Sequence, residues 1–269
     1  MNIVITGVRL ELGRLLAQKA VKRRGTPVHI NLSGQQANTL LHDGHAWKDF
    51  PRTVLAGTRR AMRAADADGA GIFVHASFAF VRAIEHGAHL EPPLRACVDA
   101  ILESETLALS GPVPACVVRL GYLYGPDSAD LLAYRRAFRL GRPYWSGATE
   151  ARQYHLHQFD AVSALLAAAK SRNTGKTCYA TAGRAVPFEQ FMDAFAHRVG
   201  RAKPLHLPLF SQTVAHLIIR EEHMQQTALA MPAGAAAPRV PGWKPRFVDY
   251  RNGLDQVIRQ WHADDSRQA

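Results

Sequence analysis

Side chains that could bind and polarise a small molecule are concentrated in residues 152–157. Arg152 carries a guanidinium group, which binds carboxylates and phosphates through paired hydrogen bonds. Tyr154, His155 and His157 follow it closely, and a histidine titrates near neutral pH, so that it can act as a general acid or base. The two histidines alternate as side chains of a strand do, and no carboxylate cage accompanies them, so we expect no metal site.

Composition limits the partners and the compartment. The three cysteines form neither a CxxC motif nor a Cys/His cluster, which excludes a disulfide scaffold and favours a cytoplasmic protein. Lys+Arg number 33 against 22 Asp+Glu, but the basic residues are scattered and no basic, aromatic-interleaved helix face is present. We expect a small-molecule substrate, which could be anionic, and neither nucleic acid nor membrane as a partner. The apolar run at residues 2–5 is typical of a strand, not of a signal peptide.

These side chains need a scaffold, and the first part of the chain predicts alternating strands and helices. The apolar β-type run at residues 2–5 is followed by Thr6-Gly7 and then by a helical apolar pattern. Further strands are predicted over residues 28–32, 72–76 and 115–120, with a very short one over 39–42, and helices over 53–65 and 94–109. This alternation predicts an α/β protein with a Rossmann-type, doubly wound parallel sheet.

After Gly125-Pro126 the composition changes and predicts a second, mainly helical part. Helices are predicted over residues 131–140, 162–170, 188–199 and 212–224, a short strand over 177–180, and an irregular segment over 228–241. We therefore divide the chain into a Rossmann-type dinucleotide-binding-like domain, residues 1–125, to which the strand 177–180 returns, and a small C-terminal substrate lobe, residues 126–269.

A series of short fragments occurs in consistent order along nearly the whole chain. The fragments are a TGxxGxxG-like turn (6–13), an HLAG-like segment (41–44), a GT…AA helix (57–65), an FVxxSS-like strand end (73–77), an RPxxVYGP-like stretch (119–126), an HVDD-like stretch (157–160) and a GWxP…GL signature (242–254). In these fragments the chain resembles the short-chain dehydrogenase/reductases, in the extended and atypical NAD(P)-dependent epimerase/dehydratase group. The resemblance implies the fold and, by analogy with the family's dimerising helices, a homodimer, but a fold does not define a reaction.

The Gly-rich turn departs from the family pattern at its middle position. Gly7 and Gly13 remain, but Leu10 stands where a second glycine would let the backbone approach a cofactor pyrophosphate. A leucine there projects into the volume of the pyrophosphate, so the two glycines could serve folding alone. If a dinucleotide does bind, we expect its contacts at Gly7 and Gly13 of the turn and at Arg9, which could offer charge to a phosphate.

The second predicted strand lacks the family's ribose-binding residues. Asn31 and Ser33 stand at its end, without a carboxylate for a ribose hydroxyl or an arginine for a 2′-phosphate. Only a few residues separate this strand from the segment 40–42, so the usual helix and third strand are predicted to be deleted. We therefore expect no cofactor, or weak NAD(P) binding.

The family's proton-transfer pair is also missing. In its YxxxK motif the lysine lowers the tyrosine pKa so that the phenol can transfer a proton, and no tyrosine here has a lysine four residues later. Spacing places the family's tyrosine on Cys97 and its lysine on Ile101. Cys97 could act as an acid or nucleophile, but its apolar neighbours favour a structural core role. The family's Ser/Thr falls on Phe78, with Ser77 one position earlier, where it could reach a ligand or bond its own backbone.

The candidate site therefore lies in the cleft expected between the sheet and the C-terminal lobe. Its candidate catalytic residues are Ser77, Tyr154 and His157, and its candidate substrate-binding residues are Tyr122, Arg152 and His155. Three functions remain open. The first is a redox-neutral biosynthetic enzyme: a lyase, isomerase, dehydratase or cyclase. The second is a non-catalytic ligand-binding or regulatory protein, and the third is an NAD(P)-dependent epimerase or reductase with displaced catalytic residues. Cofactor binding would separate the third from the other two.

Overall fold

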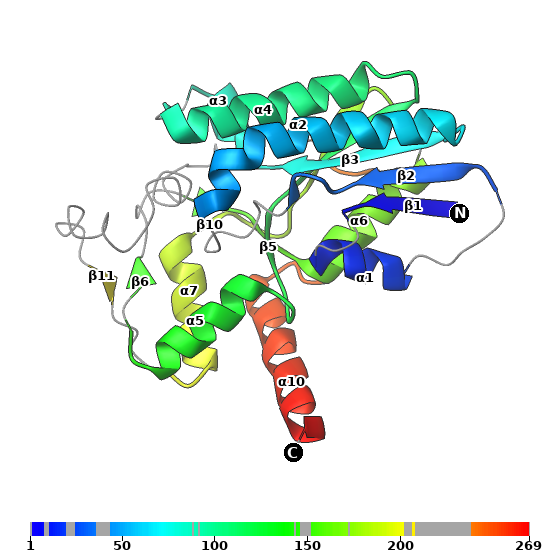
Figure 1. Ribbon diagram of the computed structural model, residues 1–269. Coiled ribbons are helices and arrows are strands. Elements are labelled where there is room, and N and C mark those ends of the chain that lie inside the picture. Colours follow the sequence, from blue (N-terminus) through cyan, green and yellow to red (C-terminus); the bar gives the residue numbers. More distant parts are fainter. Residues whose placement is uncertain are drawn as a thin grey trace.

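A parallel sheet covered by helices forms the centre of the molecule (Figure 1). The computed structural model describes residues 2–7, 11–19, 25–35, 44–87, 89–90, 92–142, 144–145, 152–171, 173–201, 206–207 and 238–268. Five parallel strands follow the order β1-β2-β3-β4-β9; they are Asn2–Thr6, Pro27–Asn31, Ile72–Phe78, Ala115–Leu120 and Lys176–Ala180. The predicted α/β class with a Rossmann-type parallel sheet is confirmed.

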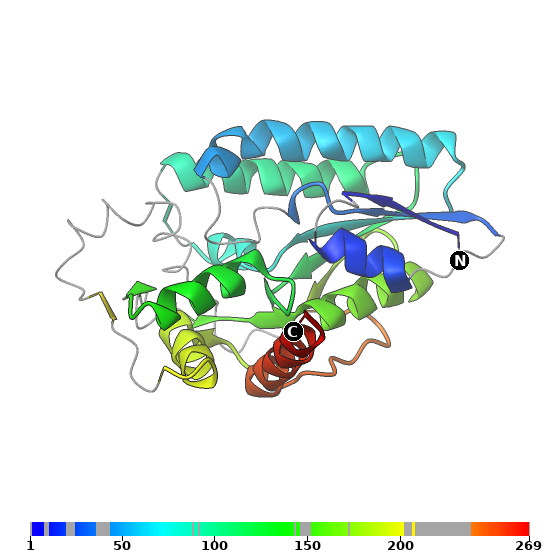
Figure 2. The same ribbon diagram turned by 60° about the horizontal axis from the view of Figure 1, so that its bottom comes forward.

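Helices form one layer on each face of the sheet (Figure 1 and Figure 2). The layers consist of α2 (Gly44–Ala67) and α4 (Pro92–Leu109) on one face, and α1 (Glu11–Lys19) and α6 (Gln158–Ser171) on the other. The alternation of side chains along β3 explains both layers, because Val74 belongs to the apolar core beneath α1 and α6, whereas Phe73 packs beneath α2 and α4.

The position of β2 corrects one assignment made from the sequence. β2 lies between β1 and β3, with Ile30 paired to Ile5 on one side and to Val74 on the other. In the Rossmann order 3-2-1-4-5-6 the strand in this position is the fourth one. In the family the HLAG segment belongs to the fourth strand, so the HLAG-like segment is residues 31–34 and not residues 41–44. Of the latter, 41–43 lie outside the described residues and Gly44 begins α2. The assignment of residues 41–44 from the sequence was wrong, because the order in which strands pair is not visible in the sequence.

The connection between α1 and β2 is too short for the usual second and third strands. Only residues 20–26 join the end of α1 to the start of β2, whereas one parallel crossover already needs a dozen or more residues. The deletion therefore includes two strands and their helix, one strand more than the sequence predicted. As a result β1 is the outer strand of the sheet as described.

The deletion also changes the hand of the first crossover. The step from β1 to β2 crosses the sheet in the same direction as the steps from β2 to β3 and from β3 to β4, yet α1 lies on the face opposite α2 and α4 (Figure 1). The first crossover therefore has the opposite hand to the next two. The step from β4 to β9 runs in the same direction, and its helix α6 lies on the face of α1, so this step has the same hand as the first crossover. About 98% of such crossovers are right-handed, and for the first one the missing outer strands explain the difference from the steps between β2 and β4.

A second apolar core joins the C-terminal helices α5 (Ala129–Arg139), α7 (Phe188–Arg198) and α10 (Tyr250–Gln268). Trp261 anchors this core to the loop after β5, because its Nε1 atom donates a hydrogen bond to the Pro126 carbonyl oxygen at 2.7 Å. The remaining elements are α3 (Val81–Glu85) and the strand pairs β5 (Tyr122–Tyr124) with β8 (His155–His157), β7 (Arg152–Gln153) with β10 (Val186–Pro187), and β6 (Tyr144–Trp145) with β11 (His206–Leu207).

Most predicted elements agree with the structure within a few residues. The largest difference is α2, which begins at Gly44 and continues through Pro51, whereas the apolar pattern predicted a helix over residues 53–65. The strand predicted over 39–42 and the helix predicted over 212–224 lie outside the described residues, and the proposed domain division stays a prediction. No helix within the described ranges is long and apolar enough to cross a membrane.

Candidate functional site

The short parallel pair of β5 and β8 brings together four of the polar residues of the cleft. Its register pairs Tyr122 with His155 and Tyr124 with His157. The ring centroids are 6.1 Å apart in the first pair and 5.2 Å apart in the second. The two histidines, although only two residues apart in sequence, have different surroundings.

His155 has a buried nitrogen without a partner. Its ring stacks on Phe191, with centroids 3.9 Å apart and planes inclined by 6°. The Nε2 atom is buried and makes no hydrogen bond to any described residue. Burial lowers the pKa of the imidazole to about 3, so His155 is neutral at physiological pH and can meet a ligand as a hydrogen-bond donor or acceptor.

A cavity of about 380 Å³ lies against His155. It is lined by His155, Ala182, Gly183, Arg184, Val248, Asp249, Tyr250 and Arg251. These residues come from the start of β8, from the segment after β9 and from the start of α10. Open α/β sheets bind ligands outside the carboxyl ends of their strands, which makes this cavity the candidate binding site.

Two local features shape the cavity wall. Gly183 has a φ of 60°, and a Cβ atom at this position would collide with the carbonyl oxygen of Val248, so the approach of these two segments requires glycine. Asp249 precedes α10 and its Oδ1 atom accepts a hydrogen bond from the Arg251 backbone N–H at 2.9 Å, which fixes the start of the helix.

The charged groups of the cavity are two guanidiniums and one carboxylate. The Arg184 side chain is exposed and has no ion-pair partner among the residues described. Arg251 lies over the Tyr250 ring, 5.0 Å from its centroid, and its Nη1 atom is 3.6 Å from Asp249 Oδ2. The Tyr250 hydroxyl donates to the Gln190 carbonyl oxygen at 3.4 Å. Burial raises the pKa of Tyr250, so this phenol stays protonated.

His157 and Tyr124 are held by the protein itself. The backbone N–H of Phe159 donates to His157 Nδ1 at 3.2 Å, so the proton of the neutral ring is on Nε2, which donates to Gln256 Oε1 at 3.0 Å. Burial lowers the pKa of His157 to about 4. The Tyr124 hydroxyl donates to the Tyr250 carbonyl oxygen at 3.3 Å. Both side chains therefore connect β5 and β8 to α10 and leave no free group for a substrate.

Ser77 belongs to a buried ion-pair network. Its hydroxyl donates to a Glu105 carboxylate oxygen, and that carboxylate also accepts two hydrogen bonds from Arg119, at 2.9 and 2.7 Å. Arg119 is further paired with Glu85 at 2.7 Å and donates to the Tyr179 hydroxyl at 2.6 Å. Ser77 is fully buried and is not part of the cavity lining.

The positions of the family's proton-transfer residues are occupied by an apolar core. Cys97 and Ile101 pack in one buried cluster with Phe78 and Phe80 beneath α2 and α4. The ring centroids of Phe78 and Phe80 are 5.5 Å apart. The structure therefore shows the side chains of Cys97 and Ile101 in the packed interior.

Arg152 and Tyr154 do not line the cavity. Arg152 pairs with Pro187 in the β7–β10 ladder and its side chain is exposed. Tyr154 packs against Ala79 and Tyr179 and, through its carbonyl oxygen, accepts a hydrogen bond from the Tyr122 backbone N–H at 2.7 Å. Among the described residues no group of histidine, cysteine and carboxylate side chains could hold a metal ion.

The part of the fold that holds the adenosine of a dinucleotide in the family is shortened in this chain. The strands that carry the adenosine contacts have no room between α1 and β2, as described above. Asn31, at the end of β2, is fully buried and its amide donates to Thr58 Oγ1 at 3.2 Å and to His75 Nδ1 at 3.0 Å. Because β2 occupies the position of the fourth strand, Asn31 does not stand where the family binds the ribose, and its side chain is already hydrogen-bonded within the protein. Arg9 and Leu10 of the phosphate turn lie outside the described residues.

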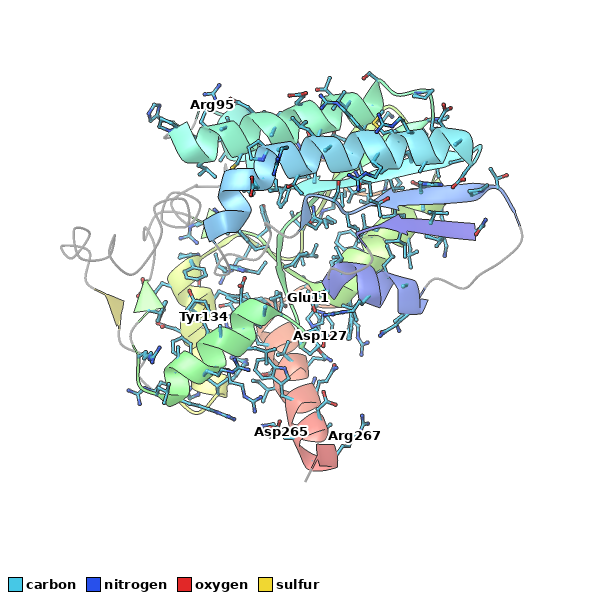
Figure 3. All side chains as sticks on the ribbon, in the orientation of Figure 1. Glu11, Arg95, Asp127, Tyr134, Asp265 and Arg267 are labelled. Carbon is cyan, nitrogen blue, oxygen red and sulfur yellow. The ribbon has the colours of Figure 1, made fainter. Side chains whose placement is uncertain are left out.

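The amino end of α1, where a pyrophosphate would bind, carries an acidic side chain. Glu11 is the first residue of α1, and its carboxylate accepts hydrogen bonds from the Ala129 backbone N–H at 3.0 Å and from Gln158 Nε2 at 2.9 Å. Burial raises its pKa, and Asp130 and Asp127 raise it further; Figure 3 shows Glu11 and Asp127 near each other. Gly7, with a φ of 87°, and the buried Gly13 remain in place, but this acidic environment disfavours an anion.

Solved structures share this fold. A human epimerase family protein solved with NADPH superposes with a TM-score of 0.72 at 15% identity, over 96% of this chain and 99% of that one. A UDP-glucose 4-epimerase from Thermotoga maritima, solved with UDP-glucose, gives a TM-score of 0.66 at 14% identity, over 98% and 99% of the two chains. At such low identity the likeness shows the fold alone.

The sequence itself has a closer relative, although no family model matches it. A 3-diazoavenalumate denitrifying reductase from a Streptomyces species is 31% identical over 223 residues, which cover 78% of this chain and 72% of that protein. The chain therefore belongs to the short-chain dehydrogenase/reductase superfamily, in the same family as this reductase.

Apart from His155, the polar residues of the cavity lining were not among the predicted site residues; they are Arg184, Asp249, Tyr250 and Arg251. Tyr250 and Arg251 belong to the C-terminal signature, which indicated the family but not a site. Nothing in the spacing of these residues indicates that the start of α10 meets the end of β9. Of the predicted site residues, the cavity contains His155, with Tyr122 beside it.

Proposed function

We propose that the chain is an enzyme that converts a small molecule at the cavity beside His155 by a redox-neutral reaction: an elimination, isomerisation, dehydration or cyclisation. The observation that carries this proposal is the connection through residues 20–26, which replaces the strands that would hold the adenosine of a hydride-donating dinucleotide. The apolar cluster at Cys97 and Ile101 supports it, because the family's redox reaction needs a proton donor there.

The groups present are suited to binding and polarising a substrate. Two guanidiniums and a neutral His155 surround the cavity. Positively charged and hydrogen-bond-donating groups of this kind stabilise negative charge that develops on an oxygen atom in a transition state. Because the pKa of His155 is about 3, it is a weak base at neutral pH, and we assign it to substrate binding rather than to proton abstraction.

A reductase is the second candidate, favoured by the relative in Streptomyces. The name of that protein describes a reductive loss of nitrogen from a diazo-bearing carboxylate. A reductase function for this chain would require a reduced nicotinamide held mainly through the turn at Gly7 and Gly13, without the usual adenosine strands. The two candidates share the substrate cavity and differ in the need for a hydride donor.

Cofactor binding separates these candidates. We expect no saturable binding of NADPH or NADH by isothermal titration calorimetry, with the Streptomyces reductase as the reference protein under the same conditions. Reduced nicotinamide mononucleotide, which lacks the adenosine, should be titrated as well. Micromolar binding of either dinucleotide would overturn the cofactor-free proposal in favour of an NAD(P)-dependent epimerase or reductase. Substrate-dependent oxidation of NADPH or of the mononucleotide would identify the reductase.

A further inference from the structure

Two of the residues that line the cavity carry a polar group without a partner in the described part of the chain. The Nε2 atom of His155 is buried without a hydrogen bond, and the guanidinium of Arg184 has no ion-pair partner in the described part of the chain. A buried polar atom without a partner destabilises a protein by about 1–3 kcal/mol. Such an atom is rare in native structures and calls for a functional or structural reason. A ligand that bonds to Nε2 supplies that reason.

The charge of the cavity wall selects the ligand's charge. Arg184 and Arg251 contribute two positive charges and Asp249 one negative charge, so the lining carries a net charge of +1. Arg198, which is close to Tyr250, is already paired with Asp255 at 2.6 Å. A monoanion therefore balances the wall, whereas a dianion leaves an uncompensated negative charge. Guanidinium groups bind a carboxylate through paired hydrogen bonds.

The size and the apolar part of the wall limit the rest of the ligand. A volume of about 380 Å³ is near the lower end of the roughly 300–1,000 Å³ typical of ligand pockets. Val248 is 58% exposed at this wall, which is unusual for a large apolar side chain in the described structure. Together with Ala182 and the face of Tyr250, it provides an apolar surface that a planar hydrocarbon body can cover.

We propose that the cavity binds the carboxylate of a compact aromatic or conjugated acid. Arg184 and Arg251 hold the carboxylate, and His155 Nε2 forms a hydrogen bond with a second polar group of the ligand. This inference deepens the proposed function and rests on it only for the choice of site. The binding step needs no cofactor and can be measured alone.

The test uses the full chain without dinucleotide and three probes of similar shape. We expect 4-hydroxybenzoate to bind in isothermal titration calorimetry, and the neutral 4-hydroxybenzamide and the dianionic phenyl phosphate to bind more weakly. The variant Arg184→Gln should weaken 4-hydroxybenzoate binding by roughly 10- to 150-fold, since hydrogen bonds to charged groups contribute about 1.5–3 kcal/mol. Arg184 is exposed and unpaired, so this variant should unfold at the same temperature as the wild type.

The matched control is Arg142→Gln, which removes an exposed arginine that is not part of the cavity lining and should leave the affinity unchanged. Any one of four results would overturn the inference. They are equal binding of the acid and the amide, tighter binding of phenyl phosphate, no binding of the acid at millimolar concentration, and an unchanged affinity in Arg184→Gln. A shift of the His155 Nε2 resonance on addition of 4-hydroxybenzoate to ¹⁵N-histidine-labelled protein would support it. The outcome is independent of NADPH oxidation, so the failure of either proposal can be recognised separately.

Discussion

Replacement of His155 by phenylalanine is expected to stabilise the ligand-free protein. Phenylalanine keeps a flat ring against Phe191, where the two rings are now 3.9 Å apart, and removes the buried Nε2 atom that has no partner. An unsatisfied buried group costs about 1–3 kcal/mol. Allowing for imperfect packing of the larger ring, we expect the free energy of unfolding to rise by about 1 kcal/mol, and the melting temperature by roughly 2–4 °C.

The same substitution at His157 is the matched control and should have the opposite sign. Both nitrogens of His157 are bonded, to Gln256 and to the Phe159 backbone, so His157→Phe leaves two groups without partners and should destabilise the protein by about 1–3 kcal/mol. Urea unfolding with linear extrapolation measures both effects. If His155→Phe is as destabilising as His157→Phe, then Nε2 of His155 has a partner within the protein and the argument for a ligand fails.

Two further predictions concern protonation and backbone conformation. Burial lowers the pKa of His75 and His157 to about 4 and that of His155 to about 3, from 6.5. Between pH 6.5 and about 4 the unfolded chain therefore binds more protons than the folded protein. The free energy of unfolding falls as the pH decreases through this range, by up to about 1.4 kcal/mol per pH unit for each histidine. Urea midpoints at a series of pH values should show a smaller slope in His155→Phe, and an unchanged slope would contradict the depressed pKa. Gly183→Ala should destabilise the protein more than Gly175→Ala, because both glycines have a positive φ, of 60° and 72°, but only Gly183 faces a close carbonyl oxygen. Equal losses in urea unfolding would mean that the contact at Gly183 does not limit the cavity wall.

The proposed function rests on three departures from the family pattern. A shortened connection removes the adenosine strands, Glu11 places a carboxylate at the amino end of α1, and the positions of the proton-transfer pair are filled by Cys97 and Ile101. The C-terminal part has kept a cavity with arginine side chains and an unpartnered histidine nitrogen. The proposed function uses the part of the fold that these changes left in place.

The candidate site was predictable only in part. Sequence reasoning identified the segment 152–157 and placed His155 among the substrate-binding residues, and the cavity contains it. It gave similar weight to Ser77, which the structure shows bonded to Glu105, and to Arg152, whose side chain points to solvent. Residue type alone does not show whether the polar group of a serine or an arginine is already hydrogen-bonded within the folded protein.

The sequence by itself determined the fold class, most strand and helix positions, and the loss of the YxxxK pair, because hydrophobic periodicity and motif spacing are properties of neighbouring residues. Only the tertiary structure decided that β2 lies between β1 and β3, and that His157 is bonded while His155 is not. It also brought the segment after β9 to the start of α10. These properties depend on contacts between residues far apart in the chain. Such contacts decide which strands pair and which buried polar atoms are hydrogen-bonded.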